Sequence, residues 1–193
     1  KRIKKIYCFP GNGGTNQIAE NVNINAKEID KLKKFITSKK INLVIVGPEQ
    51  PLVNGIVDSL IKSNIKVFGP SKIASQLEGS KIFTKNICKK YKIPTANFGV
   101  FKNKNDALNF IKKTKLPVVV KADVLAAGKG VYICENYSDA ENSINEIFDG
   151  KFGVAKNILI EEFLRGEEMS YFIISDGKTF KEFQTAQDHK RVF

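Results

Sequence analysis

The chain has 193 residues, and 42% of them are hydrophobic, which is enough for the packed core of one ordinary domain or two small ones. No apolar run approaches the roughly 20 residues that cross a bilayer, and the basic first residues lack the apolar stretch of a secretion signal. These features exclude a disordered chain and a membrane-spanning protein. They predict a soluble, cytoplasmic protein.

Neither the charge nor the cysteines point to a macromolecular or metal partner. The net charge of +12 would suit a polyanion, but the lysines are spread over predicted helix faces, without aromatic side chains interleaved with arginine. Lysine-rich composition explains this charge better, so we expect no nucleic-acid partner. The three cysteines, Cys8, Cys88 and Cys134, are too far apart for a disulfide framework or a zinc site.

Residues 1–80 are predicted to form an α/β layer with a doubly wound parallel sheet. The predicted elements are a strand at 6–9, a helix at 27–40, a strand at 42–47, a helix opened by 48–51 and a strand at 66–69. The continuous apolar run at 42–47 is typical of a strand buried on both faces. Ligands of such sheets lie beyond the carboxyl ends of the strands, where the turns 10–15 and 47–52 fall.

Residues 81–193 are predicted to form a mixed, largely antiparallel module. A helix at 71–78 precedes this module, and a helix at 81–91, closed by Pro94, begins it. The expected strands are 98–101, 117–122, 130–134, 157–164, 169–175 and 179–186, and the expected helices are 105–113 and 138–148. Asp176-Gly177 is a strong signal for a hairpin between the last two strands.

A glycine-containing loop, VVVKADVLAAGKG, separates the strands at 117–122 and 130–134. It is not a P-loop, because Gly128-Lys129 is followed by Gly130 instead of Ser or Thr. Glycines let the backbone approach anionic oxygens, and Lys121 and Lys129 add positive charge, a combination that suits a triphosphate. From the loop alone, a plain hairpin with solvated lysines explains the pattern equally well.

Two further segments gain meaning only beside the loop. In IEEFLRGEE (160–168), an acid could accept from an adenine amino group, main-chain groups near Phe163 and Leu164 could meet the ring edge, and a later acid could bind ribose. In GSKIFTK (79–85), Lys81 opens a helix. Taken separately, a solvated acidic strand end and a surface lysine are the better interpretations.

The three elements together, in this order, resemble the ATP-grasp fold. The motifs PGNGGT, VGPEQPLVNGIVD, QLEGSKIFTK, VVKADVLAAGKGV, IEEFLRGEEMSYFIISDG and QDHKR resemble the glycinamide ribonucleotide synthetase (phosphoribosylamine–glycine ligase) family over essentially every residue. The resemblance implies an α/β doubly wound pre-ATP-grasp domain at 1–80 and a partial ATP-grasp α+β domain at 81–193. It also implies that a first strand–turn unit and a C-terminal half are missing.

The resemblance implies ATP-dependent ligation of glycine to 5-phosphoribosylamine in purine biosynthesis, through a glycyl phosphate intermediate. Mg²⁺ or Mn²⁺ would be held by ligands downstream of Phe193, so the 193-residue chain is expected to be inactive by itself. Another ATP-grasp carboxylate–amine ligase or a carboxylase is the alternative. The oligomeric state stays open, with a monomer favoured.

The resemblance also assigns roles to individual residues. Lys129 and Arg191 would be catalytic. ATP would be bound by Lys81, Lys121, Gly128, Lys129, Gly130, Glu161, Phe163, Leu164 and Glu168. The substrates would be bound by Gly11, Asn12, Gly13, Thr15, Gly47, Pro48, Glu49, Asp188, His189, Lys190 and Arg191. Val124 stands where the family pattern has glycine, so either its backbone is ordinary or it stiffens the loop.

Overall fold

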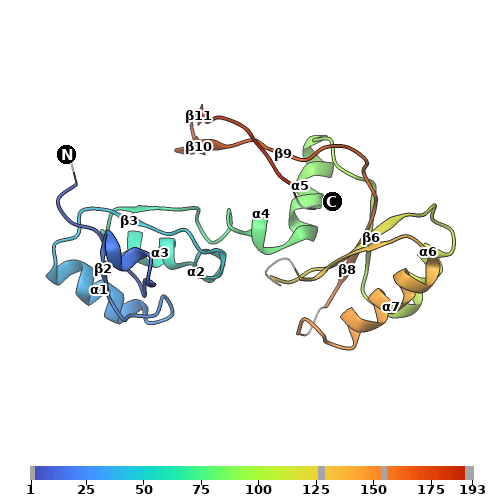
Figure 1. Ribbon diagram of the computed structural model, residues 1–193, viewed down its shortest axis with the longest axis horizontal. Helices are drawn as coiled ribbons and strands as arrows, with labels where there is room; N and C mark the ends of the chain where they lie inside the picture. The colour runs from blue at the N-terminus through green and yellow to red at the C-terminus, as the bar shows by residue number, and fades with distance from the viewer. Residues whose placement is uncertain (1–2, 126–128, 154–155, 190–193) are drawn as a thin grey trace.

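The computed structural model of the chain describes residues 3–125, 129–153 and 156–189 (Figure 1). The elements up to β4 form one part, and the elements after α5 form a second part around a larger sheet. Helices α4 (Gln76–Gly79) and α5 (Lys81–Tyr91) lie between them. Within the described ranges, none of the helices combines the length and apolar character that a bilayer span requires.

The N-terminal part is built on one apolar cluster. Its elements are β1 (Tyr7–Cys8), η1 (Thr15–Gln17), β2 (Glu20–Asn21), α1 (Ile29–Ser38), β3 (Val44–Ile45), α2 (Glu49–Asn54), α3 (Ile56–Ile61) and β4 (Val67–Phe68). The predicted helical period is confirmed, because Leu32 and Ile36 of α1 are buried against Ile56, Val57 and Leu60 of α3. This cluster holds α1 and α3 to the strands.

The strands of this part pair in parallel, as predicted, but form two separate pairs, β1–β2 and β3–β4. In the doubly wound order a central strand separates two such pairs, and the described residues provide no strand there. The prediction that 42–47 is buried on both faces is wrong, since Leu43 is 54% and Ile45 is 69% exposed. Val44 and Val46 pack on the cluster, which covers only one face.

The second part contains a four-stranded sheet in the order β5-β8-β6-β7. All of its pairings are antiparallel, as predicted from the sequence. Its strands are β5 (Phe98–Phe101), β6 (Val118–Ala122), β7 (Val131–Cys134) and β8 (Ile158–Glu162). Helices α6 (Lys104–Ile111) and α7 (Tyr137–Phe148) pack on one face, where Val118, Val120 and Ala122 are fully buried. Strand alternation therefore places Val119 and Lys121 on the opposite face.

The last described residues form short antiparallel pairs. Strand β9 (Met169–Ser170) pairs with β12 (Ala186–Gln187), and β10 (Ile173–Ser175) pairs with β11 (Phe180–Glu182). The predicted turn is confirmed: Gly177 has a φ of 87°, and the Asp176 carboxylate accepts from the Thr179 N–H at 2.7 Å. This hairpin extends away from the four-stranded sheet (Figure 1).

Candidate functional site

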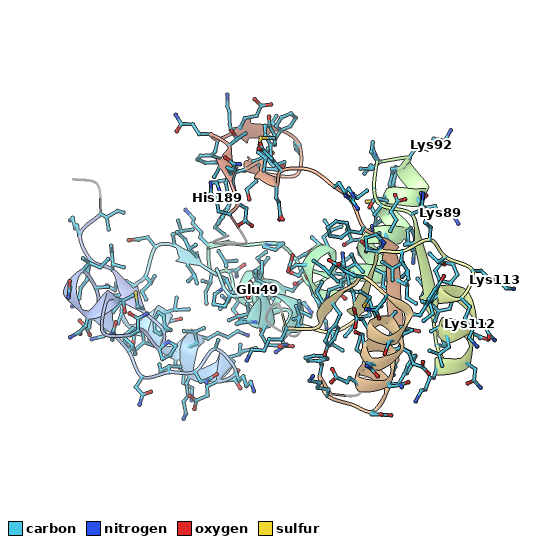
Figure 2. The ribbon with its side chains drawn as sticks, turned by 45° about the vertical axis from the view of Figure 1, so that its right-hand side comes forward. Glu49, Lys89, Lys92, Lys112, Lys113 and His189 are labelled. Atoms are coloured by element: carbon cyan, nitrogen blue, oxygen red, sulfur yellow. The ribbon has the colours of Figure 1, made fainter. Side chains whose placement is uncertain are left out.

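A cavity of about 580 Å³ lies where the two parts of the chain meet. It is lined by Glu49, Gln50, Leu77, Glu78, Lys81, Thr84, Lys85, Lys121, Val124, Leu125, Gly130, Val131 and Glu161. Glu49 lies between the two parts in Figure 2. Four residues that the sequence assigned to nucleotide binding therefore meet in one cavity: Lys81, Lys121, Gly130 and Glu161.

The floor of the cavity carries one carboxylate shared by two lysines. Glu161 is 6% exposed, and its register opposite Val119 places it on the same face of the sheet as Lys121. Its Oε2 accepts from the Lys121 Nζ at 2.8 Å, and its Oε1 lies 3.3 Å from the Lys85 Nζ. Lys85 is itself buried and donates to the Thr95 Oγ1 at 2.6 Å. The buried carboxylate is thus fully neutralised by lysines.

Lys81 ties the start of α5 to the end of β6. Its ammonium donates to the carbonyl oxygens of Ala122 at 3.0 Å and Val124 at 3.1 Å. Burial lowers the pKa of Lys81 from its usual 10.5, and the neighbouring Asp123 carboxylate opposes that shift. Asp123 also accepts from the Ile82 N–H at 3.2 Å, which satisfies one of the free N–H groups at the start of α5. An ammonium held this way is preorganised for an anion entering the cavity.

Val124 is accommodated in an ordinary backbone conformation. The described non-glycine residues with positive φ are Lys40, Asn64 and Lys92, so Val124 does not occupy the region that would demand glycine. Its side chain packs on the core between the sheet, α6 and α7, and its carbonyl accepts from Lys81. Valine at this position causes no backbone strain.

A second cavity, of about 270 Å³, lies beside the hinge that follows β8. It is lined by Leu116, Pro117, Ile133, Glu135, Phe163 and Arg165. Ile133 lies two residues beyond Val131 on β7, so both side chains belong to the face that carries Lys121. Phe163 thus lies in this second cavity, whereas Leu164 is 64% exposed. Glu168 is exposed too, and its carbonyl accepts from the Asp188 N–H at 3.0 Å.

The first turn, predicted to bind substrate, is a closed hydrogen-bonded unit outside the lining of both cavities. The Asn12 Oδ1 accepts from the Thr15 N–H at 2.9 Å, and the Thr15 hydroxyl donates to the Asn21 Oδ1 at 2.8 Å. Gly11 has a φ of 82°, and a Cβ there would lie 2.1 Å from that Asn21 oxygen. Glycine is therefore required at 11, whereas Gly13 is exposed with open space around it.

The second predicted turn reaches the main cavity through Glu49, whereas Asp188 and His189 near the end of the chain are not part of its lining. Gly47 and Pro48 are exposed and precede α2, whose first residue, Glu49, lines the cavity. Lys129, Asp188 and His189 are exposed outside the cavity lining. Figure 2 shows His189 below the hairpin. Gly128, Lys190 and Arg191 are outside the described residues, so their predicted roles stay predictions.

Sequence reasoning missed several lining residues, chiefly Lys85. The signal was present, because Lys85 follows Lys81 by one helical turn and the two side chains share a face of α5. Val131 was missed because its place opposite Lys121 depends on strand register, which local sequence does not reveal. Among the residues that the structure describes, no group of three or more His, Cys, Asp or Glu could hold a metal ion.

An antiparallel sheet backed by two helices, with lysines and an acid on its open face beside an α/β part, defines the ATP-grasp class. Residues 1–78 match the phosphoribosylglycinamide synthetase N domain, and residues 79–193 match its ATP-grasp (A) domain. The chain belongs to the phosphoribosylglycinamide synthetase family. Both matches agree with the fold that the motifs implied.

Individual relatives support the same assignment. The chain is 45% identical to the phosphoribosylamine–glycine ligase of Clostridium acetobutylicum, covering 100% of this chain and 47% of that protein. The solved phosphoribosylamine–glycine ligase of Thermotoga maritima matches with a TM-score of 0.76 and 30% identity, covering 97% of this chain and 45% of that one. The chain therefore spans about half the length of the relatives it matches.

The same fold extends to a different enzyme. The biotin carboxylase domain of the Hydrogenobacter thermophilus 2-oxoglutarate carboxylase, solved with MgADP, matches with a TM-score of 0.73 over 95% of this chain and 44% of that one. Its identity of 17% indicates a common fold only. The much higher identity to the ligases separates this chain from the carboxylase alternative at the level of family.

Proposed function

We propose that this chain supplies the ATP-binding half of a phosphoribosylamine–glycine ligase. The observation that carries the proposal is the meeting of Lys81, Lys121 and Glu161 in one cavity between the two parts of the chain. Family membership and the ligases among the relatives support the same reaction. The division into domains at residue 80 is part of this proposal.

The charges in the cavity suit a polyphosphate. The lining holds three lysines, Lys81, Lys85 and Lys121, and three carboxylates, Glu49, Glu78 and Glu161, so the charges are matched in number. Because Lys85 is held against Glu161, Lys81 and Lys121 are the ammonium donors that the cavity offers a ligand. Several ammonium donors are what a triphosphate needs while a phosphoryl group is transferred. The apolar strip of Val131 and Ile133 beside them offers a surface for a base. We infer that the hinge at Phe163 and Leu164 meets the ring edge and that Glu168 meets the ribose.

The reaction would proceed by two transfers. A carboxylate oxygen of glycine attacks the γ-phosphorus of ATP, forming glycyl phosphate as the bond to ADP breaks. The amine of 5-phosphoribosylamine then attacks the glycyl carbonyl and releases phosphate, giving glycinamide ribonucleotide. Neither transfer requires a protein nucleophile, so the residues act by positioning and by neutralising charge. Mg²⁺, when bound, would neutralise charge on the phosphates, and no group of three or more His, Cys, Asp or Glu among the described residues could hold it.

We assign the acceptor substrates to the side of the cavity that carries Glu49. The two turns, Gly11–Thr15 and Gly47–Glu49, and residues 188–191 would serve phosphoribosylamine and glycine, with Lys129 and Arg191 nearest the transferred group. Support comes from Glu49, which lines the same cavity as Lys81 and Lys121. The closed turn around Asn12 and Thr15 presents its backbone as a rigid unit.

The test measures ADP formation by a protein that contains this chain and extends to the full length of its relatives. We expect ADP only when glycine and 5-phosphoribosylamine are both present, with glycinamide ribonucleotide as the product. Matched reactions replace glycine by bicarbonate or by D-alanine. ADP formation driven by either replacement would contradict the proposal and favour another ATP-grasp enzyme. The 193-residue chain is expected to bind ATP without ligation, so ligation by that chain would contradict the predicted need for residues beyond it.

A further inference from the structure

Lys85 is a buried lysine for which the proposed reaction has no direct use. Only 11% of its side chain is exposed, it lines the main cavity, and its ammonium lies 3.3 Å from the Glu161 Oε1. We infer that Lys85 is a positioning residue, the standing counterion of Glu161, which leaves Lys121 free to turn toward a phosphate. This inference rests on the proposed nucleotide site. It adds which lysine stays paired with Glu161 and which one leaves that carboxylate for a phosphate.

The two lysines on Glu161 are held very differently. Beyond Glu161, Lys85 donates to the Thr95 hydroxyl at 2.6 Å and the Ala96 carbonyl at 3.3 Å. Its ammonium also lies 5.5 Å from the centre of the Phe98 ring. These partners belong to the chain segment before β5 and to β5 itself, so they fix Lys85 on the protein side of the carboxylate.

Lys121 is the exchangeable partner. Its ammonium hydrogen-bonds to the Glu161 Oε2 at 2.8 Å, and within the described residues this is its one hydrogen bond. Its side chain is 25% exposed, more than twice the 11% of Lys85, and it opens into the cavity. A phosphate in the cavity can therefore recruit Lys121 by a small rotation, while Lys85 stays in place.

The exchange is feasible only because Glu161 keeps a second cation. A buried carboxylate that loses its sole ion-pair partner becomes an uncompensated charge, which is strongly unfavourable. With Lys85 at 3.3 Å, Glu161 remains neutralised after Lys121 leaves. Two ammonium groups on one carboxylate also repel each other, so the loss of the more loosely anchored one is eased.

Two other roles for Lys85 make different predictions. If Lys85 contacted the phosphate directly, its charge would matter whether or not residue 161 is acidic. If Lys85 served only to join residues 95–98 to β8, its loss would lower the stability of the fold without a selective effect on phosphate-bearing ligands. Our inference requires that the effect of Lys85 pass through the charge of Glu161 and appear only with phosphate.

The experiment is a double-mutant cycle on the 193-residue chain, with ATP and adenosine binding measured by calorimetry. Lys85→Gln removes the charge and keeps a donor for Thr95, and Lys85→Arg keeps the charge. Both are made with Glu161 intact and with Glu161→Gln. Lys89→Gln is the matched control, since Lys89 is an exposed lysine on the same helix (Figure 2). Circular dichroism checks that each variant is folded, and Lys85→Arg keeps the test decisive where Lys85→Gln fails to fold.

We expect Lys85→Gln to weaken ATP binding at least tenfold, equivalent to about 1.4 kcal/mol, while Lys85→Arg stays within about threefold of the original chain. Adenosine binding should be unchanged, and Lys85→Gln should have little further effect beside Glu161→Gln. An equal loss of ATP affinity in both backgrounds would overturn the inference in favour of direct contact. Unchanged ATP affinity in Lys85→Gln, or a tenfold loss in Lys85→Arg, would also overturn it. Failure of the unmodified chain to bind ATP would instead overturn the proposed site, and the inference with it.

Discussion

Replacing Glu161 by leucine tests how much of the fold depends on the shared carboxylate. The substitution leaves the ammonium groups of Lys85 and Lys121 without their carboxylate. Breaking a buried ion pair by removing one partner costs about 3–5 kcal/mol. Lys121 can turn into the cavity and regain water, whereas Lys85, at 11% side-chain exposure, cannot. Only the Lys85 ammonium is therefore left buried without a partner. We expect the free energy of unfolding to fall by about 3 kcal/mol, the lower end of that range.

The assay is urea unfolding of the 193-residue chain, followed by circular dichroism at neutral pH. Typical domains have a free energy of unfolding of about 5–15 kcal/mol, so a loss of this size moves the midpoint clearly. Glu141→Leu is the control, because Glu141 is exposed on α7 and its replacement should change stability by less than about 0.5 kcal/mol. A loss below about 1 kcal/mol for Glu161→Leu would refute the reasoning, since Lys85 would then have no need of the carboxylate.

Three further predictions concern the turn, the helix-start lysine and the loop valine. Gly11→Ala should lower the thermal midpoint by several degrees, because φ is 82° and the new Cβ would meet the Asn21 side chain; an unchanged midpoint would show that the turn rearranges freely. Burial lowers the pKa of Lys81, so between the folded value and the unfolded 10.5 the unfolded chain binds more protons than the folded chain. In urea titrations, the stability of the original chain relative to Lys81→Met should therefore rise with pH across that interval. Parallel pH profiles for the two proteins would contradict the lowered pKa. Val124→Gly should lower stability by about 1 kcal/mol while the KM for ATP of the full-length protein stays within about twofold, since the valine backbone is ordinary; a larger KM change would mean that the side chain controls the loop.

Much of the fold could be predicted because local pattern and burial agree. The period of Leu32 and Ile36 identified α1, and the valine run of β6 was buried by two helices as its composition indicated. The strand within 42–47 is present, but its burial on both faces was predicted wrongly, since an apolar run shows that a segment can be buried but not what covers it. Its exposed Leu43 and Ile45 depend on neighbours that the described residues do not provide.

The site was foreseen in part, for a similar reason. Lys81, Lys121 and Glu161 were named because they belong to motifs, and the structure brings them into one cavity. Lys85 carried no motif, and its importance follows from tertiary contacts with Glu161 and the segment before β5. A carboxylate expected to face a ligand proves to be occupied by two lysines, a relationship that depends on strand register and helix placement together.

A crystal structure of this chain with Mg²⁺ and a non-hydrolysable ATP analogue tests the proposed site most directly. We predict phosphate oxygens within hydrogen-bonding distance of the Lys81 and Lys121 ammonium groups in the main cavity, with the Glu161 carboxylate retained by Lys85. A nucleotide bound elsewhere would contradict the proposal. So would phosphates in this cavity that contact neither lysine.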